Sequence, residues 1–149
     1  MQAILFIGIQ ATGKSTFYKE HFFHTHVRIN LDLLRTRHRE AAFLDVCQQT
    51  RQPFVVDNTN PTVADRQRYI ESSKRAGYEI IGYYFESKVG DALARNDQRT
   101  ETQRIPVQGV LHTAKRLVLP SYTEGFSRLY YVRLADNGTF CVEEWRDEV

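Results

Sequence analysis

Short runs of apolar residues alternate along the chain with longer segments in which apolar and polar residues mix. Unbroken apolar runs are typical of buried strands, and mixed segments are typical of helices that cover a sheet. We expect strands at residues 3–7, 27–29, 54–56, 78–85, 129–134 and 139–145. We expect helices at residues 14–23, 32–49, 61–76, 88–99 and 107–118. The alternation predicts a three-layer α/β domain with a mainly parallel central sheet.

Two local patterns set expected helix boundaries. Asn60 followed by Pro61 predicts a helix start, with Asn60 as the N-cap and proline at the first helical position. Within residues 32–49, three apolar residues recur at spacings that place them on one face of a single helix. These residues are Leu34, Ala41 and Leu44.

Composition narrows the class of protein. The chain has 149 residues, 42% of them hydrophobic, which suits one domain with a sizeable core. Two cysteines, Cys47 and Cys141, are too few for a disulfide framework. No run approaches the roughly 18 apolar residues of a membrane span, and the N-terminal segment lacks the features of a secretory signal. The expectation is a cytoplasmic protein with no membrane partner.

Charge alone says little about partners. The net charge is only +2, but residues 95–116 carry five basic and two acidic side chains. A local excess of positive charge suits a partner with phosphates, and it also suits a solvated helix face.

The segment Gly8-Ile9-Gln10-Ala11-Thr12-Gly13-Lys14-Ser15 fits the P-loop pattern G-x-x-x-x-G-K-[ST] in full. It lies between an expected strand and an expected helix, as a P-loop does. Glycines let the backbone approach phosphates, and amides at the helix start point at the anion. Lys14 is expected to reach the β- and γ-phosphates, and Ser15 to hold Mg²⁺. The segment predicts a P-loop NTPase-like domain that binds a nucleoside triphosphate.

A P-loop leaves the fate of the γ-phosphate open among a GTPase switch, an ATPase motor and a small kinase. The chain has no guanine-reading N-K-x-D segment, and motors are usually larger. Small size therefore favours a phosphotransferase.

A kinase needs a base for the acceptor hydroxyl and a group that orients the acceptor. Asp32 follows the expected strand 27–29, and Arg35 lies three residues further on, on the same face of a helix. One interpretation makes Asp32 the general base and Arg35 a clamp on an acceptor phosphate. The other is a helix-capping aspartate in an ion pair worth a few tenths of a kcal/mol.

Two further positions suit phosphate chemistry. Asp57 ends an apolar strand beside the P-loop, where a Walker-B aspartate holds Mg²⁺ through water. It could equally cap the turn before Pro61. Arg95 and Arg99 are four residues apart, which suits a helical lid over a triphosphate and also a solvated basic face.

Together these residues resemble the kinase domain of the 5′-polynucleotide kinases, P-loop enzymes that phosphorylate 5′-hydroxyl ends of DNA or RNA. The resemblance runs from the P-loop to about Phe126. It is carried, in order, by Gly8 to Thr16, Asn30-x-Asp32-x-x-Arg35, Asp57-Asn58-Thr59-Asn60-Pro61, Arg95-Asn96-x-x-Arg99, Ile105-Pro106-Val107 and Glu124-Gly125-Phe126.

The resemblance implies ATP as the donor, Mg²⁺ as the metal and nucleic acid 5′ ends as the substrate. It implies catalytic roles for Asp32, Lys14 and Arg99. It places the donor nucleotide on Gly8, Gln10, Ala11, Thr12, Gly13, Lys14, Ser15, Thr16, Arg95 and Arg99. It places the acceptor on Arg35, Asp32, Asn58 and Asn60, and the metal on Ser15 and Asp57.

The chain departs from the family pattern at three residues. Leu31 stands where the family usually has arginine, and Gln10-Ala11 replaces the usual Pro-Gly. Because the sequence shows no phosphatase, ligase or phosphopeptide-binding domain, we expect a kinase that acts alone or with separate ligase or phosphatase partners. Two alternatives stay open: a kinase of a small molecule such as a nucleoside or sugar, and a nucleotide-dependent nucleic-acid-binding module without transfer activity.

Overall fold

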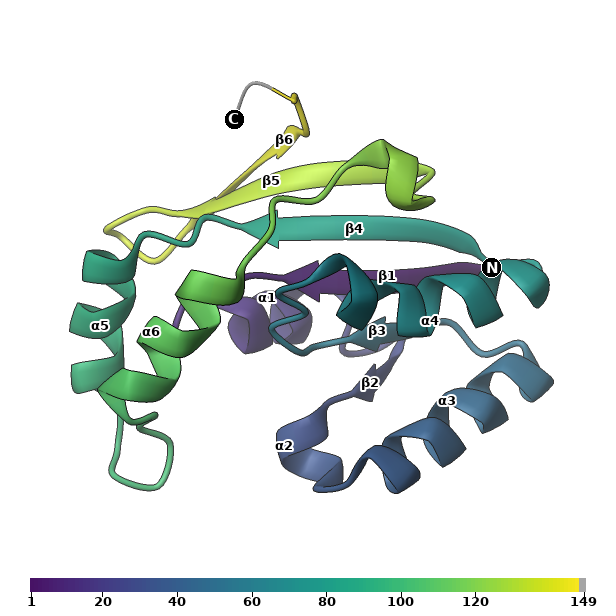
Figure 1. Ribbon diagram of the computed structural model, residues 1–149, viewed down its shortest axis with the longest axis horizontal. Helices are drawn as coiled ribbons and strands as arrows, with labels where there is room; N and C mark the ends of the chain where they lie inside the picture. Colours follow the sequence, from purple (N-terminus) through teal and green to yellow (C-terminus); the bar gives the residue numbers. More distant parts are fainter. Residues whose placement is uncertain (148–149) are drawn as a thin grey trace.

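A six-stranded sheet in the order β2-β3-β1-β4-β5-β6 forms the middle of the molecule (Figure 1). The computed structural model describes residues 1–147. The strands are β1 (Gln2–Ile7), β2 (Val27–Ile29), β3 (Phe54–Val56), β4 (Glu79–Phe85), β5 (Arg128–Leu134) and β6 (Phe140–Glu144). Every neighbouring pair is parallel except β5 and β6, which form an antiparallel hairpin. The predicted mainly parallel sheet is confirmed.

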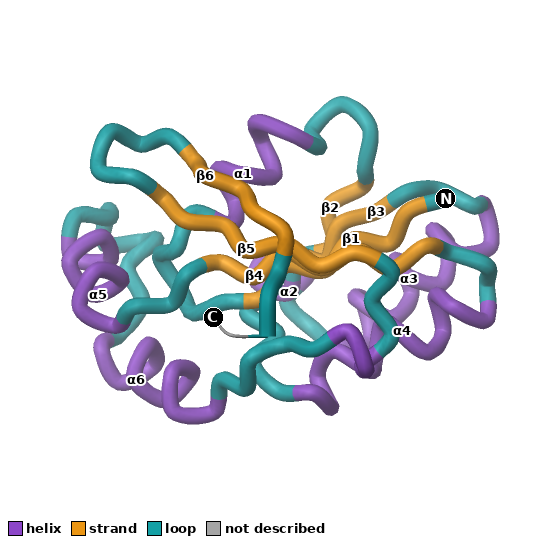
Figure 2. The backbone as a smooth tube through the Cα atoms, turned by 90° about the horizontal axis from the view of Figure 1, so that it is seen from above, coloured by secondary structure: helices purple, strands orange, loops and turns teal. Residues whose placement is uncertain are grey.

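Helices complete the three predicted layers. They are α1 (Lys14–His21), α2 (Leu31–Leu34), α3 (Arg37–Thr50), α4 (Val63–Arg75), α5 (Val89–Asp97) and α6 (Val107–Arg116), with a 3₁₀ turn at Tyr122–Glu124. Figure 2 shows α1 on one side of the sheet and α3 and α4 on the other. In Figure 1, α5 and α6 stand beyond the C-terminal ends of β1 and β4. Within residues 1–147 we find no helix with the length and apolar composition that crossing a bilayer requires.

The alternation of side chains along β1 explains why the layers form. Leu5 and Ile7 belong to the apolar cluster beneath α3 and α4, whereas Ile4 and Phe6 belong to the cluster beneath α1. Successive residues of a strand point to opposite faces, so a fully apolar strand must be covered on both sides. The central strand therefore buries its whole length and fixes where the loop after Ile7 begins.

The predicted single helix over residues 32–49 is wrong, because the chain breaks it into α2 and α3. Arg35 has φ 77°, outside the helical region, and ends α2 after Leu34. The Thr36 side chain then accepts a hydrogen bond from the Arg39 amide and starts α3. The repeat of apolar residues carries no information about such a cap, which depends on one hydroxyl.

The expected start of the next helix is also wrong. Helix α4 begins at Val63, with Thr62 as its N-cap in a capping box with Asp65. Asn60 instead takes φ 46° and donates its side-chain amide to the Phe6 carbonyl at 2.8 Å. The asparagine is used to join this loop to β1, so the reciprocal Thr62–Asp65 pair caps the helix.

A buried ion pair joins α4 to the segment that follows α6. The Arg66 side chain is fully buried, and its Nε and Nη2 donate to the two carboxylate oxygens of Glu124 at 2.7 and 3.0 Å. Its Nη1 donates to the carbonyls of Asn60 and Val118 at 3.0 Å each. The guanidinium thus ties the loop after β3 to the chain that leaves α6.

Replacing Arg66 with methionine is expected to lower the free energy of unfolding by about 3–5 kcal/mol, because Glu124 keeps a buried charge without its partner. Equilibrium denaturation by urea measures this change. The control is Arg128→Met, which breaks an exposed pair with Glu79 and should leave the unfolding midpoint close to that of the wild type. An equal loss in both variants would contradict a special role for the buried pair.

Candidate active site

The P-loop connects the end of β1 to the start of α1, and its backbone has little room for side chains at two positions. Gly8 has φ 153°, and a Cβ there would lie 3.0 Å from the Phe85 carbonyl oxygen. Gly13 has φ 94°, and a Cβ there would lie 2.8 Å from the Phe140 ring. The Gly8 amide also donates to the Thr59 carbonyl at 3.0 Å. Neighbouring strands therefore hold the loop against the C-terminal edge of the sheet.

Lys14 is folded back onto this loop. Its Nζ donates to the carbonyls of Gly8 and Ile9 at 2.9 and 2.5 Å. Burial lowers the pKa of Lys14 from 10.5 to about 8; Asp57 and Asp32 act in the opposite direction, and Arg99 adds to the lowering. The ammonium group thus lies within the electrostatic range of the other charged site residues, although three of them come from distant parts of the sequence.

Ser15 and Asp57 meet as the P-loop prediction requires. The Ser15 hydroxyl donates to Asp57 Oδ2 at 3.0 Å, and only 2% of the Asp57 side chain is exposed. A hydroxyl and a carboxylate are oxygen donors of the kind that Mg²⁺ prefers. The chemistry of this pair fits a magnesium site. Arg28 of β2 also binds the pair, through Nε to Asp57 Oδ2 at 2.9 Å and Nη2 to Ser15 Oγ at 3.1 Å.

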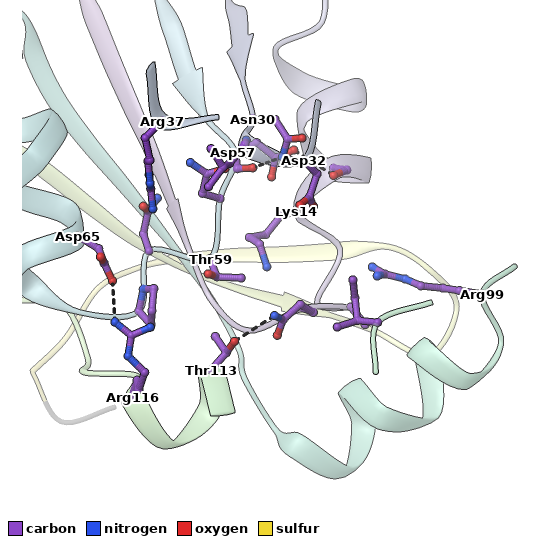
Figure 3. Close-up of a pocket in the computed structure, with 18 residues that line it drawn as sticks. Lys14, Asn30, Asp32, Arg37, Asp57, Thr59, Asp65, Arg99, Thr113 and Arg116 are labelled. Carbon is purple, nitrogen blue, oxygen red and sulfur yellow. Dashed lines mark hydrogen bonds and ion pairs between the residues drawn. The ribbon is translucent and has the colours of Figure 1, made fainter. Parts of the chain in front are cut away.

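A cleft of about 320 Å³ extends from the P-loop across the edge of the sheet. Figure 3 shows Asp32 and Arg99 on the side of Lys14, whereas Arg37 and Arg116 lie apart from them across the cleft. Asp32 lies in the first turn of α2, which places its carboxylate after the end of β2. The cleft therefore has a phosphate-binding end beside the exposed carboxylate of Asp32, and a far end where Arg37 and Arg116 pair with Glu40 and Asp65.

The structure brings most of the predicted site residues to this cleft. Those that line it are Gln10, Ala11, Lys14, Ser15, Asp32, Asp57, Asn58, Asn60 and Arg99. Gly8, Thr12, Gly13 and Thr16 belong to the loop and the first turn of α1.

Two predicted arginines lie outside the lining of the cleft. Arg95 of α5 reaches the P-loop from the lid side and donates to the Ala11 carbonyl at 3.4 Å. Arg35 is exposed at the end of α2, where the break in the helix removes the shared face with Asp32 that the spacing suggested. Its proposed contact with an acceptor stays a prediction.

The two asparagines expected at the acceptor are engaged with protein partners. The Asn58 side chain accepts from the Leu31 amide at 2.9 Å and donates to Glu40 at 2.9 Å. The Asn60 amide donates to the Phe6 carbonyl, as described above. In this arrangement both residues position backbone around the cleft, and a direct contact with substrate stays a prediction.

Sequence reasoning missed three basic residues of the site. Arg37 donates to both Glu40 and the Tyr69 hydroxyl, and burial is the largest of the effects that raise the pKa of Tyr69 to about 12. Arg116 lies 3.7 Å from Asp65. Arg28 contacts Ser15 and Asp57, the pair that fits a magnesium site. Only Arg116 had a signal in the sequence, since it belongs to the basic stretch 95–116.

The fold and the phosphate-binding loop match those of P-loop kinases. A family model described as an AAA domain matches residues 4–119, which is most of the chain. The chain belongs to this family of P-loop kinase domains.

Two relatives with assigned names match nearly the full chain at low identity. A protein of Acanthamoeba polyphaga mimivirus, provisionally named a bifunctional polynucleotide phosphatase/kinase, is 29% identical over 86% of this chain. The bifunctional polynucleotide phosphatase/kinase of Schizosaccharomyces pombe is 22% identical over 98% of this chain. The matches cover 32% and 36% of those proteins, so this chain spans about a third of the length of these relatives.

Solved structures share the fold at lower identity. Kti12 of Chaetomium thermophilum, solved with ADP-AlF3, has a TM-score of 0.68 at 15% identity, covering 90% of each chain. A gluconokinase from Sinorhizobium meliloti has a TM-score of 0.65 at 18% identity, covering 91% of this chain and 83% of that one. These likenesses confirm the three-layer α/β fold with a mainly parallel sheet.

The lowered pKa of Lys14 predicts proton uptake when ATP binds at high pH. Above pH 8 the free amine is mostly neutral, and a bound triphosphate favours its charged form. Binding at about pH 9 should therefore take up close to one proton, and binding at about pH 7 much less. Titration calorimetry in two buffers with different ionisation enthalpies measures the uptake. Lys14→Arg is the control, because arginine stays protonated; the same uptake in both proteins would contradict the assignment.

Proposed function

We propose that the protein transfers the γ-phosphate of ATP to the 5′-hydroxyl end of DNA or RNA. The observation that carries the proposal is the cleft, which places the exposed carboxylate of Asp32 at the same end as Lys14 and extends to Arg37 and Arg116, each of which is paired with a carboxylate of the protein. A polynucleotide presents a 5′-hydroxyl, which suits the end of the cleft with Asp32. The phosphates that follow it suit the end with Arg37 and Arg116. The two named relatives support this choice of acceptor.

The donor phosphates would bind at the P-loop. Backbone amides of residues 8–15 and the start of α1 provide the anion site. Lys14 would leave the carbonyls of Gly8 and Ile9 and pair with the β- and γ-phosphates. Arg99 lines the same end of the cleft and would neutralise charge on the transferring group. Arg95 would hold the lid helix against the loop through Ala11.

The acceptor would approach the γ-phosphate from the side of Asp32. Asp32 would accept the proton of the 5′-hydroxyl as the hydroxyl oxygen bonds to the γ-phosphorus, while the bond from that phosphorus to the β–γ bridging oxygen breaks and ADP leaves. Ser15 and Asp57 would hold Mg²⁺, which when bound neutralises charge on the phosphate oxygens. Arg35 would contact the phosphate on the 3′ side of the first nucleotide, as the family resemblance implies. The cytoplasmic location and the separate ligase or phosphatase partners also stay predictions.

The gluconokinase likeness keeps a small-molecule acceptor as the main rival, because that protein shares the fold. A second rival is a binding module without transfer. The acceptor test below separates all three functions.

Labelled phosphate from γ-labelled ATP with Mg²⁺ should move to a short 5′-hydroxyl oligonucleotide and hardly at all to a free nucleoside or gluconate. Asp32→Asn should lower kcat by about 10²–10⁴ while the Kd for ATP stays unchanged. Label on the nucleoside or gluconate alone would show a small-molecule kinase. ATP binding without label on any acceptor would favour the binding module. Near-normal turnover by Asp32→Asn would exclude this carboxylate as the base.

Arg35→Ala should raise the KM for the oligonucleotide by about 10- to 100-fold, because a charged hydrogen bond to phosphate is lost, and leave the KM for ATP unchanged. Arg39→Ala is the matched control, since it removes the same charge from an exposed position on α3 to which the family resemblance assigns no role. Steady-state kinetics with both substrates varied measure the effect. An unchanged KM in Arg35→Ala, with a raised one in Arg116→Ala, would move the phosphate contact to the far end of the cleft.

A further inference from the structure

The guanidinium of Arg28 binds both oxygen groups that would hold the metal. Its Nε lies 2.9 Å from Asp57 Oδ2 and its Nη2 lies 3.1 Å from Ser15 Oγ, while those two oxygens lie 3.0 Å apart. The three side chains form a closed triangle at the edge of the P-loop. Arg28 comes from β2, the edge strand of the sheet, and takes no part in the phosphate transfer described above.

Arg28 and a divalent cation compete for Asp57 Oδ2 and Ser15 Oγ. A guanidinium has five donors and no acceptor, and it stays positively charged, so it cannot ligate a metal. Magnesium bound to oxygen at about 2.1 Å would lie within a few ångströms of the guanidinium, and like charges at that distance repel strongly. Direct metal ligation at Asp57 Oδ2 and Ser15 Oγ therefore favours the departure of Arg28 from these two oxygens.

Burial explains why the Asp57 carboxylate needs a positively charged partner. Only 2% of the Asp57 side chain is exposed, and a buried carboxylate without a partner is strongly unfavourable. The Arg28 side chain is 29% exposed, and its guanidinium lies 6.0 Å from the centre of the Tyr18 ring. Because the guanidinium already lies over this ring and the side chain is partly exposed, the arginine can move further toward solvent, whereas the buried aspartate cannot.

We propose that Arg28 is a resident counter-cation of the metal site. It holds Asp57 and Ser15 while the cleft lacks nucleotide, and it moves toward solvent when Mg²⁺ arrives with the phosphates. Free divalent cations then bind the empty protein weakly, because they must displace Arg28 without the negative charge of a triphosphate. Arg28 is a positioning residue that makes metal binding depend on nucleotide.

This inference rests on the nucleotide and metal part of the proposed function and does not depend on the acceptor. Failure of phosphate transfer to an oligonucleotide would leave it standing, since metal binding is measured without acceptor and without turnover. Failure of the metal-binding test would in turn leave the identity of the acceptor open to its own assay.

The test measures Mn²⁺ binding to the full chain by the electron paramagnetic resonance signal of the free ion. Without nucleotide, Arg28→Gln should bind Mn²⁺ at least about tenfold more tightly than the wild type, because a competing charge is gone. With ADP present, the difference should shrink. Arg75→Gln, which removes a charge from the exposed end of α4, is the matched control and should bind like the wild type.

Equal Mn²⁺ affinities in the wild type and Arg28→Gln would overturn the proposal, and so would an equal gain in Arg75→Gln. Arg28→Lys covers the case in which Arg28→Gln does not fold. Lysine keeps the charge beside Asp57 but lacks the planar fork that spans both oxygens, so its gain in affinity should be smaller than tenfold but measurable. An affinity equal to that of the wild type in a folded Arg28→Lys, with Arg28→Gln unfolded, would also overturn it.

Discussion

The fully buried guanidinium of Arg66 is the constraint on which the geometry of the cleft depends. A charge without access to water must find a partner for each of its donors, and Arg66 finds them on Glu124, Asn60, Pro61 and Val118. These partners belong to the loop after β3 and to the chain that leaves α6. One side chain thus sets the spacing between the two walls that carry Asp57 and Arg116.

Several charged groups of the site have partners within the protein before any ligand arrives. Lys14 donates to carbonyls of the P-loop, Asp57 pairs with Arg28, and Arg116 lies near Asp65. Such internal partners reduce the cost of holding buried charges in an empty cleft. They also mean that ligands must replace existing contacts, so binding involves exchange of partners as well as new attraction.

The fold defines the donor end of the cleft more closely than it defines the acceptor end. The P-loop, its lysine and the serine–aspartate pair depend on β1, α1 and the end of β3, and they carry the sequence pattern that P-loop proteins share. The acceptor end depends on α2, α3 and α6, where this chain breaks one helix at Arg35 and brings Arg37 and Arg116 to the cleft. Differences of this kind among proteins of one fold allow different acceptors.

The sequence by itself determined the strands, the parallel sheet and the P-loop, because each is encoded by neighbouring residues: unbroken apolar runs, and glycines and lysine at fixed spacing. It also placed Asp32 and Asp57 at strand ends, where parallel strands bring them together. It did not reveal the break at Arg35 and Thr36, because the repeat of apolar residues continues across it. It also did not reveal the use of Asn60 against Phe6, because that contact joins residues far apart in the sequence. Only the tertiary structure put Arg28 on Asp57 and Arg37 in the cleft. Those contacts join residues from separate elements, and their energies depend on burial, which local sequence does not record.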